Sequence, residues 1–425
     1  MKTLVTGGRV IDPSQDLDGF FDLLLEDGVV ARVDESVSAS DAEVFDAEGL
    51  VVCPGLIDIH VHLREPGEEY KETVATGTRS AAVGGFTAVA CMANTKPVND
   101  SRSVTEHILE EARRAGYARV HPIGAVSKGL AGEELAEIGE MVRAGVVAVS
   151  DDGLPVANAE LMRRALLYAQ HFDIPVIQHA EDLDLTGSGV MHEGEWSTRL
   201  GLPGIPGSSE DVIVARDLIL LEDTVGRYHV AHLSTGRSLA MVRRARQAGL
   251  RVTCEVSPHH LLLTDQAVSD MEMSTATKMK PPLRASTDRE ALLEGLADGT
   301  VDAIASDHAP HHVDEKDVEF TAAPFGIVGL ETTLSLCLDR LVRPGVISIS
   351  RMIELLSTGP ARVLGIPGGS LAEGRPADVT VFHPDRSVTV DAATMASTSH
   401  NTPFDGWKLK GAPVCTFVAG KKINP

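Results

Sequence analysis

The alternation of strand-like and helix-like segments in the middle of the chain is the feature that most restricts its fold. The strand-like apolar runs span 55–62, 87–91, 119–123, 146–150, 175–179, 228–232, 251–256 and 301–307. Each precedes a stretch with helical spacing of apolar residues, at 72–83, 104–115, 133–144, 159–172, 210–222, 238–248, 288–297 and 330–341. Eight strand-then-helix units predict a (β/α)8 TIM-type barrel, with parallel strands inside and helices outside.

The two ends of the chain have a different pattern, in which short β-like runs alternate with turns. Such runs occur at 3–5, 9–11, 21–25, 29–33, 44–46, 50–52, 378–382 and 413–418. Because neither end is long enough to form a domain alone, we expect both to pair into one small β-sandwich. The predicted α/β architecture is therefore a barrel at 54–365 and a sandwich made from 1–53 and 366–425. The long links at 180–209 and 257–287 are expected to be functional.

Charge and cysteine content exclude several classes of partner. The net charge of −23 argues against binding to nucleic acid or to an anionic membrane. No apolar run is long enough to cross a bilayer and the first residues lack a signal-peptide core, so the expected location is the cytoplasm. The five cysteines are scattered without a CxxC pair, which predicts neither a disulfide nor a thiolate zinc site.

The first barrel strand carries three ionisable residues at alternate positions, Asp58, His60 and His62. On a β-strand alternate side chains share a face, so these three groups point the same way. Burying them without partners is costly. A divalent metal held by the two imidazoles solves this problem, with the aspartate outside the coordination shell.

Polar residues also follow the other predicted strands, and the carboxyl ends of all barrel strands meet at one face. These residues are Asp151, Asp152, His179, Glu181, His232, Asp307, His308 and His311. Histidine and carboxylate without thiolate suit zinc or a similar divalent ion. Five or six ligands exceed one tetrahedral site, so a carboxylate bridging two metals is plausible. A hydroxide between the metals would be the nucleophile, and an aspartate after the last strand would move its proton.

At this point the residues resemble a known family. The matching segments are PGLIDIHVHLREPG, GGFTAVACMANTKP, SDDG, HAED, HLST, SPHHL, KMKPPLR, SDHAPH, PFGIVGLET, GSLAEGRPADVTVF and NTPFDGWKLKG. The chain resembles the amidohydrolase superfamily and, within it, the bacterial type I dihydroorotases, nearly from end to end. PGxIDxHxH is common to the superfamily, whereas HLREPG together with SDHAPH and the GLET segment is typical of dihydroorotases and a few close relatives.

The resemblance implies a role for each site residue. His60 and His62 correspond to ligands of a first zinc ion, and His179 and His232 to ligands of a second, so one or two zinc ions are expected, with two favoured. Asp152 corresponds to the bridging ligand and its neighbour Asp151 to a structural residue. Asp307 corresponds to the general acid/base and is expected to touch the first metal as well. The implied substrate contacts are His62, Arg64, Asn94, Lys280, His311 as a donor, Phe325 and Gly326.

The implied activity is that of a dihydroorotase, the third step of pyrimidine synthesis. The reaction reversibly cyclises N-carbamoyl-L-aspartate to L-dihydroorotate and water. Arg64 offers a bidentate fork for the substrate carboxylate and Asn94 an amide contact. One departure is Lys280, which stands where the family usually has asparagine. Two interpretations stay open, namely a tolerated substitution with the side chain turned aside, or an altered affinity or substrate preference.

Two other functions compete with this one. A hydantoinase or allantoinase would keep the chemistry and change the substrate, but many such relatives have a carboxylated lysine at the bridging position. The fourth strand ends in Ser150, Asp151 and Asp152 and offers no lysine. A non-catalytic scaffold for aspartate carbamoyltransferase is the third hypothesis, although such homologues lose metal ligands and this chain keeps them. A homodimer or a complex with that transferase is compatible with an active enzyme and a small-molecule substrate.

Overall fold

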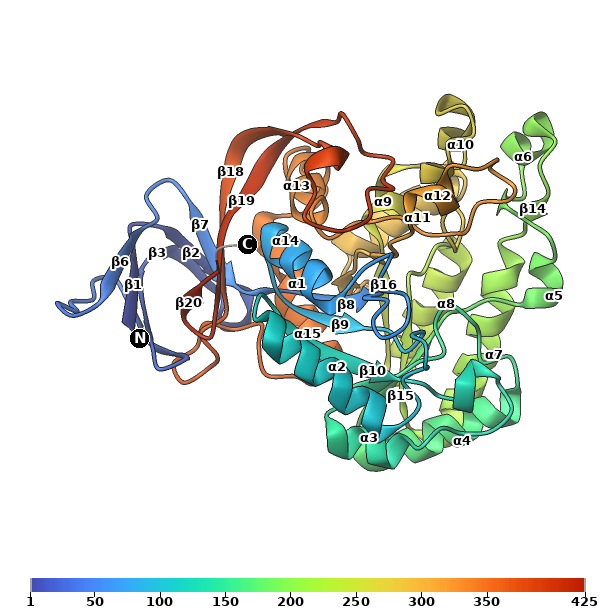
Figure 1. Cartoon of the computed structure of the whole chain (residues 1–425), viewed down its shortest axis with the longest axis horizontal. Coiled ribbons are helices and arrows are strands. Elements are labelled where there is room, and N and C mark those ends of the chain that lie inside the picture. Colours follow the sequence, from blue (N-terminus) through green and yellow to red (C-terminus); the bar gives the residue numbers. More distant parts are fainter. Residues whose placement is uncertain (1, 424–425) are drawn as a thin grey trace.

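The central part of the molecule is a parallel sheet of eight strands, as the computed structural model, which describes residues 2–423, shows (Figure 1). The strands lie side by side in the sheet in the order in which they occur in the chain. They are β8 (Leu56–Val61), β9 (Phe86–Cys91), β10 (Arg119–Gly124), β11 (Ala148–Val149), β12 (Pro175–Gln178), β15 (Arg227–Val230), β16 (Val252–Val256) and β17 (Ala303–Ile304). A parallel bridge between Val61 and His308 joins the first strand to the residues that follow the last one. This contact closes the ring, and the predicted barrel is confirmed.

Helices connect and cover the barrel strands. They are α1 (Val74–Val83), α2 (Arg102–Ala115), α3 (Ile138–Ala144), α4 (Ala159–Ala169), α7 (Ser208–Thr224), α8 (Gly236–Gln247), α11 (Ser286–Ala297) and α13 (Thr333–Cys337), followed by α14 (Ile349–Ile353) and α15 (Gly359–Leu364). In α2 the buried residues Val104, Ile108 and Ala112 recur every four positions, which gives the helix one apolar face for the barrel. Helix α3 begins five residues later than predicted, because Leu135 forms a bridge with Ser127.

The predicted helix at 330–341 is shorter than expected as an α-helix. It continues from α13 as a π-helical stretch at Leu338–Val342, and a second π-helical stretch, Glu354–Thr358, separates α14 from α15. Short 3₁₀ turns are found at Pro13–Gln15, Lys128–Leu130, Gln170–Phe172, Thr275–Thr277 and Ala392–Thr394.

The long links after the barrel strands contain small elements of their own. These are α5 (Leu183–Thr186), β13 (Met191–His192), α6 (Glu195–Leu200), β14 (Gly204–Ile205), α9 (Pro258–Leu262), α10 (Gln266–Asp270) and α12 (Val313–Lys316). In Figure 1, α5, α6 and β14 lie at the end of the molecule opposite to the N-terminus.

Strands from both chain ends build the second part of the molecule. A four-stranded sheet, in the order β5-β4-β1-β6, packs on a six-stranded sheet, in the order β20-β19-β18-β7-β2-β3. The strands are β1 (Lys2–Thr6), β2 (Arg9–Asp12), β3 (Leu17–Phe20), β4 (Asp22–Glu26), β5 (Val29–Asp34), β6 (Glu43–Asp46), β7 (Val51–Pro54), β18 (Val379–Thr389), β19 (Lys408–Val418) and β20 (Lys421–Lys422). Leu23 of one sheet and Val52, Val379 and Phe417 of the other share a buried core.

The pairing of β7 with β18 joins the two chain ends in one sheet, so the expected sandwich is confirmed. Strand β3 was not anticipated from the sequence, and the domain boundaries at 53/54 and 365/366 stay predictions. All five cysteines are free and buried, as expected. No helix within residues 2–423 has the length and apolar character needed to cross a membrane.

Candidate metal centre and active site

The six predicted metal ligands come together at the carboxyl end of the barrel. His60 lies on β8, and the others follow their strands directly: His62 after β8, Asp152 after β11, His179 after β12, His232 after β15 and Asp307 after β17. All six are buried. Two groups of them have ligand atoms within 4.8 Å of one another, namely His60 with Asp152 and His232, and His60 with His62 and Asp307.

The Asp152 carboxylate lies between two pairs of imidazoles. Its Oδ2 is 3.4 Å from Nε2 of His60 and 3.4 Å from Nε2 of His62. Its Oδ1 is 3.2 Å from Nε2 of His232 and 3.5 Å from Nδ1 of His179. One carboxylate thus presents one oxygen to each pair, which is the arrangement of a bridging ligand.

Asp307 lies beside the imidazole pair formed by His60 and His62. Its Oδ1 is 3.5 Å from Nε2 of His60 and 3.4 Å from Nε2 of His62. The backbone of Asp307 has φ 50°, and that of His232 has φ 29°. Non-glycine residues rarely adopt such left-handed conformations, and they gather where the surrounding structure holds a functional geometry.

Three of the four imidazoles have a partner on the nitrogen that faces away from Asp152. Nδ1 of His60 lies 2.6 Å from Glu255 Oε1, Nδ1 of His62 lies 2.9 Å from Asn94 Oδ1, and Nε2 of His179 lies 3.1 Å from Glu181 Oε2. Each oxygen accepts a hydrogen bond from the ring N–H, which leaves the opposite nitrogen with a free lone pair. These partners therefore select the tautomer in which the inner nitrogens can bind a cation.

The chemistry of this cluster fits a metal ion. Nε2 of His60 is buried without a hydrogen-bond partner among the described residues, and its nearest polar neighbours are two carboxylates. A lone pair facing carboxylate oxygens is repulsive unless a cation lies between them. Two ligand atoms bound to one tetrahedral zinc ion at about 2.0–2.2 Å lie roughly 3.3–3.5 Å apart. The nitrogen–oxygen separations around Asp152 are of this size.

Glu255 on β16 was missed by the sequence interpretation. Besides His60, its carboxylate contacts Nε2 of His229 at 3.2 Å and accepts from the backbone N–H of His232 at 3.2 Å. Burial alone would raise its pKa, but the adjacent imidazoles of His60 and His229 lower that pKa to about 2. The signal was present as one acidic residue in the strand RVTCEV, and His229, to which we assigned no role, is its partner.

The carboxylates of Asp58 and Asp151 accept hydrogen bonds from backbone N–H groups. Asp58, expected beside the imidazoles, instead accepts from the backbone N–H groups of His60 (3.1 Å) and Ser306, and thereby ties β8 to the end of β17. Burial raises the pKa of Asp58 to about 6. Asp151 accepts from the backbone N–H groups of Val126 and Ser127 at 2.8 and 2.9 Å, which agrees with the structural role expected for it.

The predicted substrate contacts surround this cluster. Arg64 is buried, has φ 62° and donates from Nε to the Pro310 carbonyl at 3.1 Å. His311 donates from Nε2 to the Phe325 carbonyl at 2.8 Å, and its Nδ1, which has no hydrogen-bond partner among the described residues, lies 3.4 Å from Oε2 of Glu315. Burial and the charge of Arg64 lower the pKa of His311 to about 3, so the ring is neutral near pH 7.

Gly326 follows at a position that requires glycine. Its φ is 130°, and a Cβ atom there would lie 2.8 Å from the Cβ of Ala309 and 3.0 Å from Nε2 of His311. Nζ of Lys280 lies 2.9 Å from Oε1 of Glu181.

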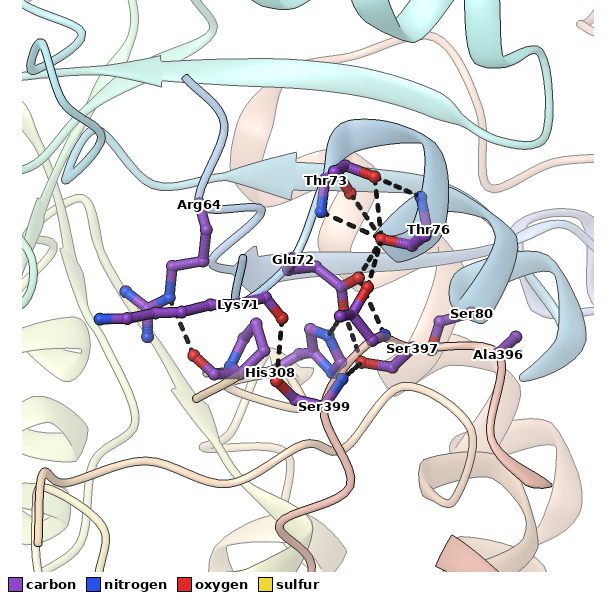
Figure 2. Close-up of polar contacts among 12 residues, drawn as sticks. Arg64, Lys71, Glu72, Thr73, Thr76, Ser80, His308, Ala396, Ser397 and Ser399 are labelled. Carbon is purple, nitrogen blue, oxygen red and sulfur yellow. Dashed lines mark hydrogen bonds and ion pairs between the residues drawn. The ribbon is translucent and has the colours of Figure 1, made fainter. Parts of the chain in front are cut away.

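A segment near the C-terminus, residues 396–401, contacts Lys71 and Glu72 through Ser397 and Ser399, which lie beside His308 (Figure 2). The Glu72 carboxylate accepts from Ser397 Oγ and lies 3.2 Å from Nε2 of His308. Ser399 Oγ lies 2.9 Å from the carbonyl oxygen of Lys71 and 2.7 Å from that of His311. His308 in turn accepts the backbone N–H of His62 on its carbonyl at 2.8 Å. The segment 396–401 thus braces the loops after β8 and β17.

Comparison with known proteins agrees with this geometry. A family model described as Dihydro-orotase-like matches residues 49–238. A dihydroorotase from Syntrophotalea carbinolica is 55% identical over 421 residues, which cover 99% of this chain and 98% of the relative. The chain belongs to the dihydroorotase family. A second dihydroorotase, from Geobacter metallireducens, is 53% identical over 424 residues and covers 100% of this chain and 99% of the relative.

Solved structures support the fold of this dihydroorotase-family chain. An L-hydantoinase (dihydropyrimidinase) from Arthrobacter aurescens superposes with a TM-score of 0.87 at 25% identity, and the match covers 99% of this chain and 95% of that one. The resemblance seen in the sequence motifs is therefore confirmed over the full length of the chain.

Proposed function

We propose that this protein is a dihydroorotase, which interconverts N-carbamoyl-L-aspartate and L-dihydroorotate with release or uptake of one water. The observation that carries the proposal is the Asp152 carboxylate between two imidazole pairs, with Asp307 beside the first pair. Relatives at 53–55% identity over the full chain are dihydroorotases, which favours this substrate over a hydantoin.

We propose two zinc ions as the resident metals. His60 and His62 would hold the first, His179 and His232 the second, and Asp152 both. Bound there, zinc supplies Lewis acidity toward the ring carbonyl and makes water acidic enough to act as a nucleophile near neutral pH.

Asp307 is the proposed general acid/base. In ring opening its carboxylate accepts a proton from the attacking water and delivers it to the leaving ring nitrogen. In cyclisation the reacting substrate carboxylate takes up one proton from solution, and Asp307 accepts the proton of the attacking ureido nitrogen and returns it to the departing hydroxyl, which leaves as water. Its buried position beside His60 and His62 keeps bulk water away from this transfer.

The substrate is proposed to lie between the metal ligands and the loop at Phe325 and Gly326. Arg64 binds its carboxylate, and Asn94 contacts the ureide beside His62. His311 was expected to donate, but its Nε2–H is engaged by the Phe325 carbonyl. His311 would therefore contact the substrate through Nδ1, which lies 3.4 Å from Oε2 of Glu315. Lys280 stays a predicted substrate contact, although Glu181 already binds its ammonium group.

Replacing Arg64 by methionine is expected to raise KM for dihydroorotate about a hundredfold, because a charge-assisted bidentate contact is lost. Steady-state kinetics on dihydroorotate measures this effect. An R64K variant, which keeps the charge but not the fork, should lie between the two. An unchanged KM in R64M contradicts the assigned contact.

The proposed function is tested by turnover before and after chelation. We expect purified protein to hydrolyse dihydroorotate and to cyclise carbamoyl aspartate, to lose both activities in chelator and to regain them with added zinc. Hydantoin and allantoin serve as control substrates. Preferred turnover of either control, or turnover of dihydroorotate that survives complete metal removal, contradicts the proposal.

A cytoplasmic location, a homodimer and a complex with aspartate carbamoyltransferase remain predictions from the family resemblance. Light scattering on the protein alone and after mixing with the transferase tests the two assemblies.

A further inference from the structure

Lys280 lies between the metal ligands and the loop that carries Phe325. We propose that Lys280 is a positioning residue, which holds the Glu181 carboxylate on His179 and links this pair to the substrate loop. The inference rests on the proposed metal-binding role of His179. It gives a physical reason for a lysine where the family usually has asparagine.

The contacts on the metal side form a continuous chain. Nζ of Lys280 lies 2.9 Å from Oε1 of Glu181, and Oε2 of the same carboxylate lies 3.1 Å from Nε2 of His179. The other donor to Oε1 is the hydroxyl of Thr186 at 2.7 Å. The Glu181 side chain is only 6% exposed, so without Lys280 a buried anion would keep one neutral donor on that oxygen. Such a carboxylate is costly to bury and free to rotate away from the imidazole.

The contacts on the substrate side involve the same ammonium group. Nζ of Lys280 lies 5.2 Å from the ring centroid of Phe325, within the range of a cation–π contact. The Phe325 carbonyl is the acceptor for Nε2 of His311. One side chain therefore touches the outer partner of a metal ligand and the residue that fixes His311. An asparagine side chain is neutral and two heavy atoms shorter along the chain, so it cannot make both contacts.

Outer partners orient an imidazole ligand and raise its basicity, and their loss typically costs 10–100-fold in metal affinity. We therefore expect Lys280→Met to weaken zinc binding about tenfold. Methionine keeps most of the length of the lysine side chain but removes its charge. Zinc is titrated into the full-length apoprotein in competition with a chromophoric chelator, which needs no catalytic turnover. Lys280→Arg should restore most of the affinity because it keeps the charge.

A double-mutant cycle assigns the effect to Glu181. Glu181→Gln alone should weaken zinc binding to a similar extent, and the double variant should be no worse than either single variant, because both act through one contact. Lys421→Met, on the exposed β20, is the matched control and should bind zinc like the parent protein. Circular dichroism at the assay temperature verifies that each variant is folded.

Three results overturn the proposal. Unchanged zinc affinity in Lys280→Met with an increased KM makes Lys280 a direct substrate contact. If the losses of zinc affinity in the two single variants add up in the double variant, Lys280 does not act through Glu181. If Lys280→Arg loses as much zinc affinity as Lys280→Met, the charge of the side chain is not what supports zinc binding. If the parent protein fails to turn over dihydroorotate while the zinc results hold, the proposed function fails and the positioning role stands.

Discussion

Asp307→Asn is expected to lower kcat in both directions by at least about a thousandfold. The amide has the shape of the carboxylate, but it can neither accept the proton of the attacking nucleophile nor return it to the leaving group, and general acid/base catalysis contributes about 10²–10⁴-fold. Within residues 2–423, Asp152 is the only other carboxylate that contacts both His60 and His62. Initial rates of dihydroorotate hydrolysis and carbamoyl aspartate cyclisation measure the loss.

The control for this variant is Asp314→Asn, which removes an exposed carboxylate on α12 near the same face and should leave kcat unchanged. Zinc content, measured by elemental analysis, separates a lost proton carrier from a lost metal. An activity of Asp307→Asn within tenfold of the parent value, at equal zinc content, means that another group carries the proton.

Asp152→Ala is expected to abolish turnover and to reduce bound zinc from two ions to at most one. Its carboxylate is the only group within residues 2–423 that lies within 3.5 Å of all four imidazoles, one pair on each oxygen. Without it, neither imidazole pair has an anionic ligand in common with the other, and two cations at close range repel each other. Zinc stoichiometry and kcat are the two readouts, and retention of two zinc ions contradicts a bridging role.

Asp151→Ala provides the matched comparison one residue earlier. This change leaves the backbone N–H groups of Val126 and Ser127 without their acceptor, at a cost of about 1–3 kcal/mol for each buried group. We expect a lower free energy of unfolding with zinc stoichiometry preserved in the folded protein. The two neighbouring aspartates thus separate metal binding from fold stability.

The cluster of proposed metal ligands could be predicted from the sequence because its members lie at or just after the ends of the barrel strands. The end of a strand can be recognised in the local sequence. Because the carboxyl ends of all barrel strands meet at one face, the predicted fold alone brings His60, Asp152, His179 and His232 together. The outer partners are harder to predict, since Glu255 appears as a single acidic residue in an apolar strand. The contact between Glu72 and Ser397 spans 325 positions of the chain, and no local pattern signals it. The late start of α3 was also not predictable from the local sequence. The apolar spacing indicates a helix from residue 133, but a bridge between Ser127 and Leu135 keeps these residues out of the helix.

The segment 396–401 has a consequence for how this enzyme matures during synthesis. Every proposed metal ligand has left the ribosome once residue 307 has, yet the residues that brace His308 and His311 come almost a hundred positions later. A nascent barrel would therefore gather its proposed metal ligands before the contacts that brace the loops after β8 and β17 exist. We therefore expect a product truncated before residue 396 to keep the proposed zinc ligands and to lack the contacts of Ser397 and Ser399 with these loops.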